Sequence, residues 1–106
     1  MVLERALIRI AVGQEPEFEH SLIAAREVIA KAAGFCSFRA LRGIESPQDY
    51  LLLIEWDSLA AHTEGFRGSQ LFDQWRALIG PYFDGTPQVE HYAPLRSAET
   101  APEQSG

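Results

Sequence analysis

With 106 residues the chain has room for one hydrophobic core, because single domains commonly hold about 100 to 150 residues. Its 46% apolar residues exclude a disordered chain, and a net charge of −6 without any basic stripe disfavours nucleic acid as a partner. Glu4, Arg5 and Arg9 interrupt the N-terminal apolar run, so no membrane span is expected and the cytoplasm is the expected location.

A strand, a helix and a second strand are predicted in the first half of the chain. Residues 4–12 alternate with a period of two, which predicts a strand with one apolar face: Ala6, Ile8, Ile10 and Val12. Apolar residues then recur at helical spacing from residue 18 to residue 32, which predicts an amphipathic helix of about five turns. Residues 35–44 alternate again, and in this second strand we expect the lone Cys36 to be a small buried apolar group.

The second half of the chain begins with the strand that we expect to be the most buried. Residues 50–56 are apolar on both faces until their end, which is typical of a central strand covered from two sides. Ser58 can cap a short helix that extends to about Glu64. Ser69 can cap a second helix, which Pro81 ends.

The end of the chain completes a ferredoxin-like order, βαββαβ, of an α+β protein. Residues 89–93 predict the last strand, and the polar residues 96–106 are expected to be a flexible tail after a single domain of residues 1–95. Right-handed crossovers then give a four-stranded antiparallel sheet of order 4-1-3-2 with both helices on one face. The apolar residues 51–54 leave the other face in need of a cover, and a second copy of the chain is the simplest one. We therefore expect a homodimeric barrel.

Three motifs carry a resemblance to a known family. They are the strand ending in Trp56 with the following Asp57-Ser58-Leu59-Ala60-Ala61-His62, the Phe66-Arg67-Gly68-Ser69 link, and the Phe72-x-x-Trp75 helix. With these motifs the chain resembles the antibiotic biosynthesis monooxygenases, a family of dimeric ferredoxin-like barrels. The resemblance implies oxidation of electron-rich polycyclic phenols to quinones by molecular oxygen, with no flavin, metal or haem. Such a site removes a proton, holds the anion and excludes water.

Most of the candidate site residues lie at or after the end of the central strand. His62 is the candidate general base, because histidine titrates near neutral pH, and Arg67 is the candidate group that stabilises a phenolate or quinone oxygen. The structural alternative for His62 is a partly exposed histidine on the face of a helix. For Arg67 it is a salt bridge that fixes the link between the helices. The candidate substrate-binding residues are Trp56, Phe66, Phe72, Trp75 and His91. The alternative for the four aromatic residues is a place in the core, and for His91 a hydrogen-bonded histidine near the dimer interface.

We expect neither a metal nor a cofactor. The histidines His20, His62 and His91 lie on three different elements, and no glycine-rich phosphate loop follows a strand. The leading function, implied by the family resemblance, is a cofactor-independent monooxygenase for an aromatic polyketide-like phenol or quinol. The alternative is a non-catalytic small-molecule-binding or stress-related dimer. An open cavity with converging polar groups would favour the first of these.

The haem-degrading relatives in the same superfamily use an asparagine, a tryptophan and an iron-ligating histidine. The corresponding positions here are approximately Ala6, Phe66 and Arg76. Alanine offers no hydrogen bond to an iron-bound ligand, and the cationic guanidinium has no free lone pair for ferric iron. We therefore expect the protein not to be a haem-degrading enzyme.

Overall fold

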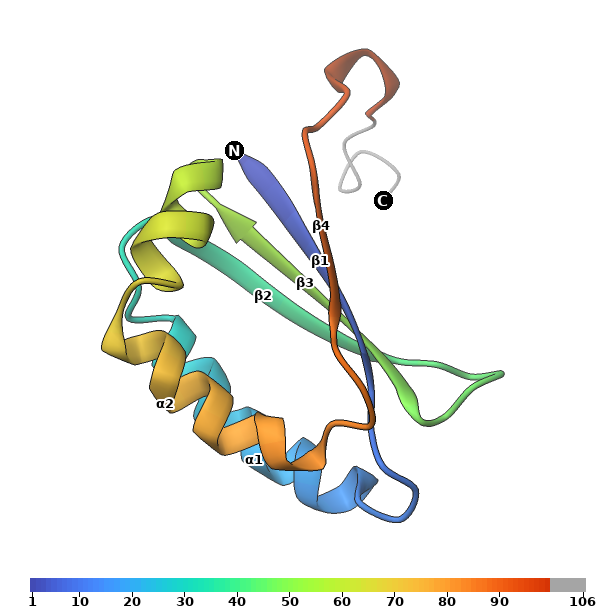
Figure 1. Cartoon of the computed structure of the whole chain (residues 1–106). Coiled ribbons are helices and arrows are strands. Elements are labelled where there is room, and N and C mark those ends of the chain that lie inside the picture. The colour runs from blue at the N-terminus through green and yellow to red at the C-terminus, as the bar shows by residue number, and fades with distance from the viewer. Residues whose placement is uncertain (100–106) are drawn as a thin grey trace.

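The computed structural model describes residues 1–99 and shows a four-stranded antiparallel sheet with two helices against one face (Figure 1). The elements follow in the order β1 (Val2–Arg9), α1 (Glu15–Ile29), β2 (Phe35–Arg42), β3 (Asp49–Trp56), η1 (Ala61–Phe66), α2 (Gln70–Ile79), η2 (Gly80–Tyr82), β4 (Gln88–Tyr92) and η3 (Arg96–Ala98). The sheet order β2-β3-β1-β4 confirms the predicted 4-1-3-2 arrangement and the ferredoxin-like α+β class. None of the helices within residues 1–99 could span a membrane.

The hydrophobic core lies between the two helices and the helix-covered face of the two central strands. Alternate residues of β1 and β3 point into it: Ala6, Ile8, Tyr50, Leu52, Ile54 and Trp56. The apolar face of α1 packs against them through Phe18, Leu22, Ala25 and Ile29. Each large apolar side chain buried in this way contributes about 1.5–3 kcal/mol. The core thus fixes which side chains of β1 and β3 can reach the space under α2.

The helix-free face of the sheet carries cross-strand rows of mixed character. Leu7, Leu51 and Leu41 lie side by side in one row, and Arg5, Leu53 and Arg39 lie in the next. Leu51 and Leu53 are only half-buried in the single chain. β3 is therefore apolar on both faces, as expected, and no other element of the protomer covers Leu51 and Leu53 on the helix-free face.

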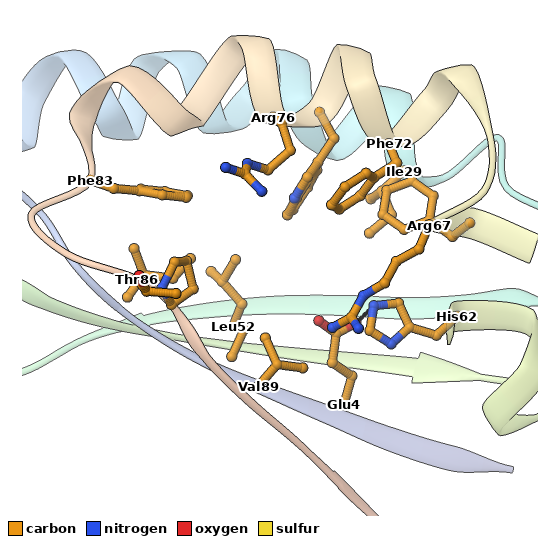
Figure 2. Close-up of a pocket in the computed structure, with 15 residues that line it drawn as sticks. Glu4, Ile29, Leu52, His62, Arg67, Phe72, Arg76, Phe83, Thr86 and Val89 are labelled. Carbon is orange, nitrogen blue, oxygen red and sulfur yellow. Dashed lines mark ion pairs between the residues drawn. The ribbon is translucent and has the colours of Figure 1, made fainter. Parts of the chain in front are cut away.

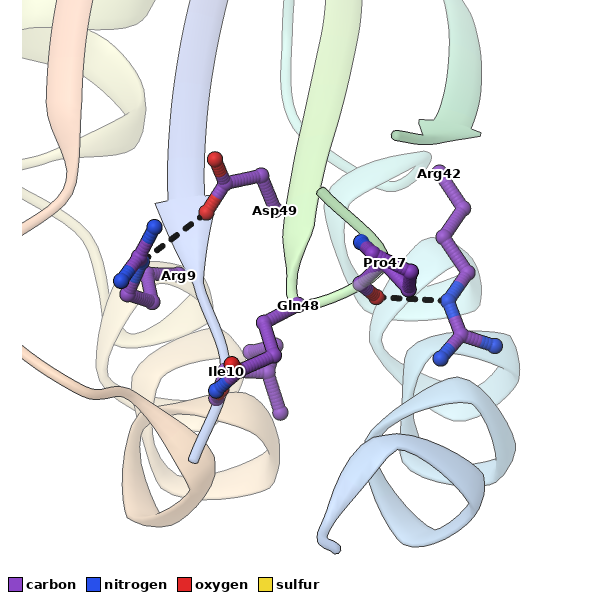
Figure 3. A network of polar contacts seen from close by, with 6 residues as sticks. All are labelled: Arg9, Ile10, Arg42, Pro47, Gln48 and Asp49. Atoms are coloured by element: carbon purple, nitrogen blue, oxygen red, sulfur yellow. Dashed lines mark hydrogen bonds and ion pairs between the residues drawn. The ribbon is translucent and has the colours of Figure 1, made fainter. Parts of the chain in front are cut away.

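The turn between β2 and β3 is tied to the end of β1 by polar contacts (Figure 3). The guanidinium of Arg42 donates from Nε to the Pro47 carbonyl at 2.7 Å, which closes the hairpin turn. Gln48 donates from its side chain to the Ile10 carbonyl at 3.1 Å, and its own carbonyl accepts from the Ile10 backbone N–H at 2.8 Å. These bonds fix the sheet at the end opposite to η1.

Local details differ from the sequence-based expectations. The first strand ends at Arg9 rather than near Val12, whose side chain is 79% exposed, because the chain turns through Gly13 at φ +86°. The expectation of a buried Cys36 is wrong: a β-bulge between Phe35 and Ser37 leaves it exposed.

Two predicted segments are also shifted at their ends. The short helix expected up to about Glu64 is the π-helical η1, which extends to Phe66. Of the expected tail, residues 96–98 form the short turn η3, and residues 100–106 lie outside the described residues.

Candidate functional site

A cavity of about 300 Å³ lies between α2 and the helix-covered face of the sheet (Figure 2). Its wall is rich in aromatic side chains: Phe66, Phe72, Trp75 and Phe83. Ionisable side chains also line it: Glu4, His62, Arg67 and Arg76. The volume lies at the lower end of the range for small-molecule sites, roughly 300–1,000 Å³. The space under α2 is therefore an open cavity with converging polar groups and is not filled by the aromatic core.

Glu4 brings a carboxylate from β1 into this cavity. It lies on the same side of the strand as Ala6 and is only 6% exposed. The indole Nε1 of Trp56 donates a hydrogen bond to Glu4 Oε1 at 3.0 Å. Burial raises the pKa of Glu4, while the Trp56 hydrogen bond and the charge of Arg67 act in the opposite direction. The result is an oriented carboxyl group whose second oxygen has no hydrogen bond from residues 1–99.

His62 is buried beside Glu4 and contacts a partner with each ring nitrogen. Its Nε2 lies 3.3 Å from Glu4 Oε1, and its Nδ1 lies 2.8 Å from Nε2 of His91. The Trp56 ring stacks on the imidazole with ring centroids 5.2 Å apart. Desolvation, and then the charges of Arg67 and His91, lower the pKa of His62 to about 4. His62 is therefore neutral at pH 7 and lies between the Glu4 carboxyl group and His91.

The π-helical turn η1 places His62 and Phe66 on one buried face. The Arg67 N–H donates to the His62 carbonyl at 3.1 Å, which is the wider spacing of a π-helix. The Ser58 hydroxyl accepts a hydrogen bond from the Ala61 N–H at 3.1 Å, so Ser58 caps the segment as predicted. Arg67 directly follows the turn and extends toward Glu4 and His62 (Figure 2).

The candidates from the sequence fall into two groups in space. Those that line the cavity are His62, Phe66, Arg67, Phe72 and Trp75. Trp56 and His91 are not among the lining residues: Trp56 lies behind His62 and holds Glu4, and His91 reaches His62 from β4. His91 pairs with Glu4 across the β1–β4 ladder, so both point to the helix-covered face.

Glu4 and Arg76 line the cavity although neither is a candidate site residue from the sequence. A signal for Glu4 was present, because a carboxylate in phase with Ala6 and Ile8 must share their buried face. Arg76 follows Trp75 on α2, and its guanidinium lies over the Phe72 ring, 5.8 Å from the centroid.

The Glu4, His62 and His91 side chains do not form a metal site. Glu4 and His91 contact opposite nitrogens of the same imidazole, so the three side chains cannot converge on one ion. Within residues 1–99 no other cluster of His, Cys, Asp or Glu could hold a metal.

Comparison with known proteins identifies the family. The family model for antibiotic biosynthesis monooxygenases matches residues 1–78. The chain belongs to the antibiotic biosynthesis monooxygenase family. The uncharacterized protein YczJ of Bacillus subtilis is 39% identical over 92 residues, which cover 87% of this chain and 97% of YczJ.

Solved structures agree with this membership. A candidate antibiotic biosynthesis monooxygenase from Bordetella bronchiseptica superposes with a TM-score of 0.86 at 35% identity, covering 89% of this chain and 96% of that one. A point mutant of SnoaB, a cofactor-independent oxygenase from Streptomyces nogalater, superposes with a TM-score of 0.76 at 17% identity. That match covers 95% of this chain and 96% of SnoaB, and at this identity it shows the shared fold.

Proposed function

We propose that the protein is a cofactor-independent monooxygenase that oxidises an electron-rich aromatic phenol or quinol with molecular oxygen. The observation that carries the proposal is the convergence of Glu4, His62 and Arg67 at one end of an aromatic cavity. Family membership supports it, and SnoaB is a cofactor-independent oxygenase with the same fold.

The proposed reaction needs no external reductant. For a phenol with a free para C–H carbon, loss of the phenolic proton makes that carbon electron-rich, and it forms a C–O bond with dioxygen. The O–O bond then breaks as the para proton is lost. One oxygen atom stays in the quinone, and the other leaves as water with the two hydrogens that the substrate lost. The substrate supplies all four electrons, so the protein needs only to move protons, stabilise an anion and exclude water.

The base in this mechanism is the Glu4–His62 pair rather than His62 alone. An imidazole with a pKa of about 4 is a weak acceptor for a phenolic proton, whereas burial raises the pKa of the neighbouring carboxyl group. Glu4 takes the phenolic proton at Oε2, the oxygen that Trp56 and His62 do not contact. His62 connects Glu4 to the half-buried His91 through its two ring nitrogens, which gives the proton a path out of the cavity. Arg67 reaches the same end of the cavity as Glu4 and His62 (Figure 2), and its guanidinium stabilises the phenolate oxygen there.

The active form in this proposal is a homodimer joined through the helix-free sheet face. That face exposes part of Leu51 and Leu53 at its centre, and a β-sheet with one uncovered apolar face is normally covered by another layer. Arg5 Nη1 lies 3.3 Å from Glu90 Oε1, yet this buried atom has no hydrogen bond from residues 1–99. A second sheet would cover the leucines and offer acceptors to Arg5.

The test is the fate of labelled dioxygen. With 1-naphthol as substrate, the purified protein should form the quinone faster than a buffer blank, with one labelled oxygen atom per quinone. If no quinone forms beyond the blank for several one- and two-ring phenols, the protein is the alternative, a non-catalytic binding dimer.

A further inference from the structure

Two guanidinium groups reach the same cavity from different elements. Arg67 extends from the link after η1 toward the Glu4 end, and Arg76 extends from α2 nearer to Phe83 (Figure 2). Within residues 1–99 neither guanidinium has a carboxylate at ion-pair distance or a side-chain hydrogen bond. Other arginines of the protein do pair across elements, as Arg9 does with Asp49 at 3.0 Å.

The two arginines differ in their electrostatic surroundings. Glu4 is the one carboxylate among the described residues that line the cavity, and the charge of Arg67 acts on it and on His62. Arg76 lies over the apolar Phe72 ring instead. Arg76 is exposed at the cavity wall and has no carboxylate at ion-pair distance within residues 1–99, although the whole protein carries a net charge of −6. A cation placed in this way is suited to an anionic group of a ligand.

We propose that the substrate is a one- or two-ring aromatic acid, whose carboxylate binds Arg76 while its phenolic hydroxyl lies at Glu4 and His62. A cavity of about 300 Å³ limits the ring system to this size. Phe72 and Trp75 supply aromatic walls beside Arg76. The assignment of the hydroxyl end rests on the proposed monooxygenase function; the carboxylate end rests on Arg76 alone.

The competing explanation for Arg76 is structural. It lies in the last turn of α2, where a cation is favourable because the carboxyl end of a helix carries partial negative charge. That role predicts no preference for an anionic ligand. Ligand binding therefore separates the two explanations.

The experiment is isothermal titration calorimetry with two probes of equal shape, 6-hydroxy-2-naphthoate and 6-hydroxy-2-naphthamide. The proteins are wild type, Arg76→Gln, Arg76→Lys and the control Arg26→Gln, which removes an exposed arginine of α1. Circular dichroism verifies that each variant is folded. Wild type and Arg26→Gln should bind the carboxylate about tenfold or more tightly than the amide, with a smaller ratio at high salt. Arg76→Gln should lose this preference and Arg76→Lys should keep part of it.

Either of two results would overturn the inference. One is that wild type binds both probes equally or fails to bind the carboxylate at millimolar concentration. The other is that Arg76→Gln retains the full preference. Because the titration needs no turnover, a wild type that prefers the carboxylate but forms no quinone from 1-naphthol would keep the anionic ligand and lose the monooxygenase proposal.

Discussion

Acid should destabilise the folded protein through His62, and the structure sets the size of the effect. Burial holds the pKa of His62 at about 4, below its ordinary value of 6.5. Between these two values the unfolded chain binds a proton at this position and the folded protein does not. The free energy of unfolding therefore falls as the pH falls through this window and is nearly constant above it. A difference of about 2.5 pKa units corresponds to roughly 3 kcal/mol, of which about 2 kcal/mol is lost by pH 5.

Urea denaturation of wild type and His62→Gln at pH 7, 5 and 4 measures this contribution. The raised pKa of Glu4 acts in the opposite direction, because the folded protein holds that proton more tightly, so the two proteins are compared with each other. Between pH 7 and pH 4 wild type should lose about 3 kcal/mol more than His62→Gln. His20→Gln, an exposed position on α1, should follow wild type. Equal pH dependence in wild type and His62→Gln would refute the idea that His62 is held neutral in the site.

Two further predictions test the assembly and the support of the base. Leu51→Asp should convert the dimer to a monomer in light scattering, because it buries a charge between Leu7 and Leu41 in the sheet interface, whereas Ile23→Asp on the exposed side of α1 should not. A monomeric wild type at micromolar concentration would contradict the interface. Trp56→Phe removes the hydrogen bond to Glu4, so the pKa of Glu4 should rise and the rising limb of the pH–rate profile should move to higher pH. An unmoved limb would show that Glu4 is not the base.

The fold could be predicted from the sequence because hydrophobic periodicity records which face of each element is buried. The β3 strand and α1 follow their periods closely. The exposure of Cys36 could not be predicted, because a β-bulge changes the facing of one residue without changing the composition of the strand. The end of β1 at Arg9 could not be predicted, because the alternation in the sequence continues to Val12, past the point where strand pairing stops.

The site could be predicted only in part, because its chemistry depends on contacts between distant segments. His62 and Arg67 are close in the sequence and could be placed together from the resemblance. The contact of His62 with His91 depends on the pairing of β4 with β1, which fixes Glu4 opposite His91. That register is non-local, so the row of contacts from Glu4 through His62 to His91 becomes visible only in three dimensions.

Oxygen uptake by purified wild type, Glu4→Gln and His62→Ala tests the central claim most directly. The substrate is 1-naphthol, and the reference is a buffer blank. Glu17→Gln, at an exposed position on α1, is the matched control for Glu4→Gln. The account predicts uptake well above the blank for wild type and Glu17→Gln, and a loss of about 10²–10⁴-fold in both site variants. A wild type that equals the blank, or site variants that equal an active wild type, would contradict it.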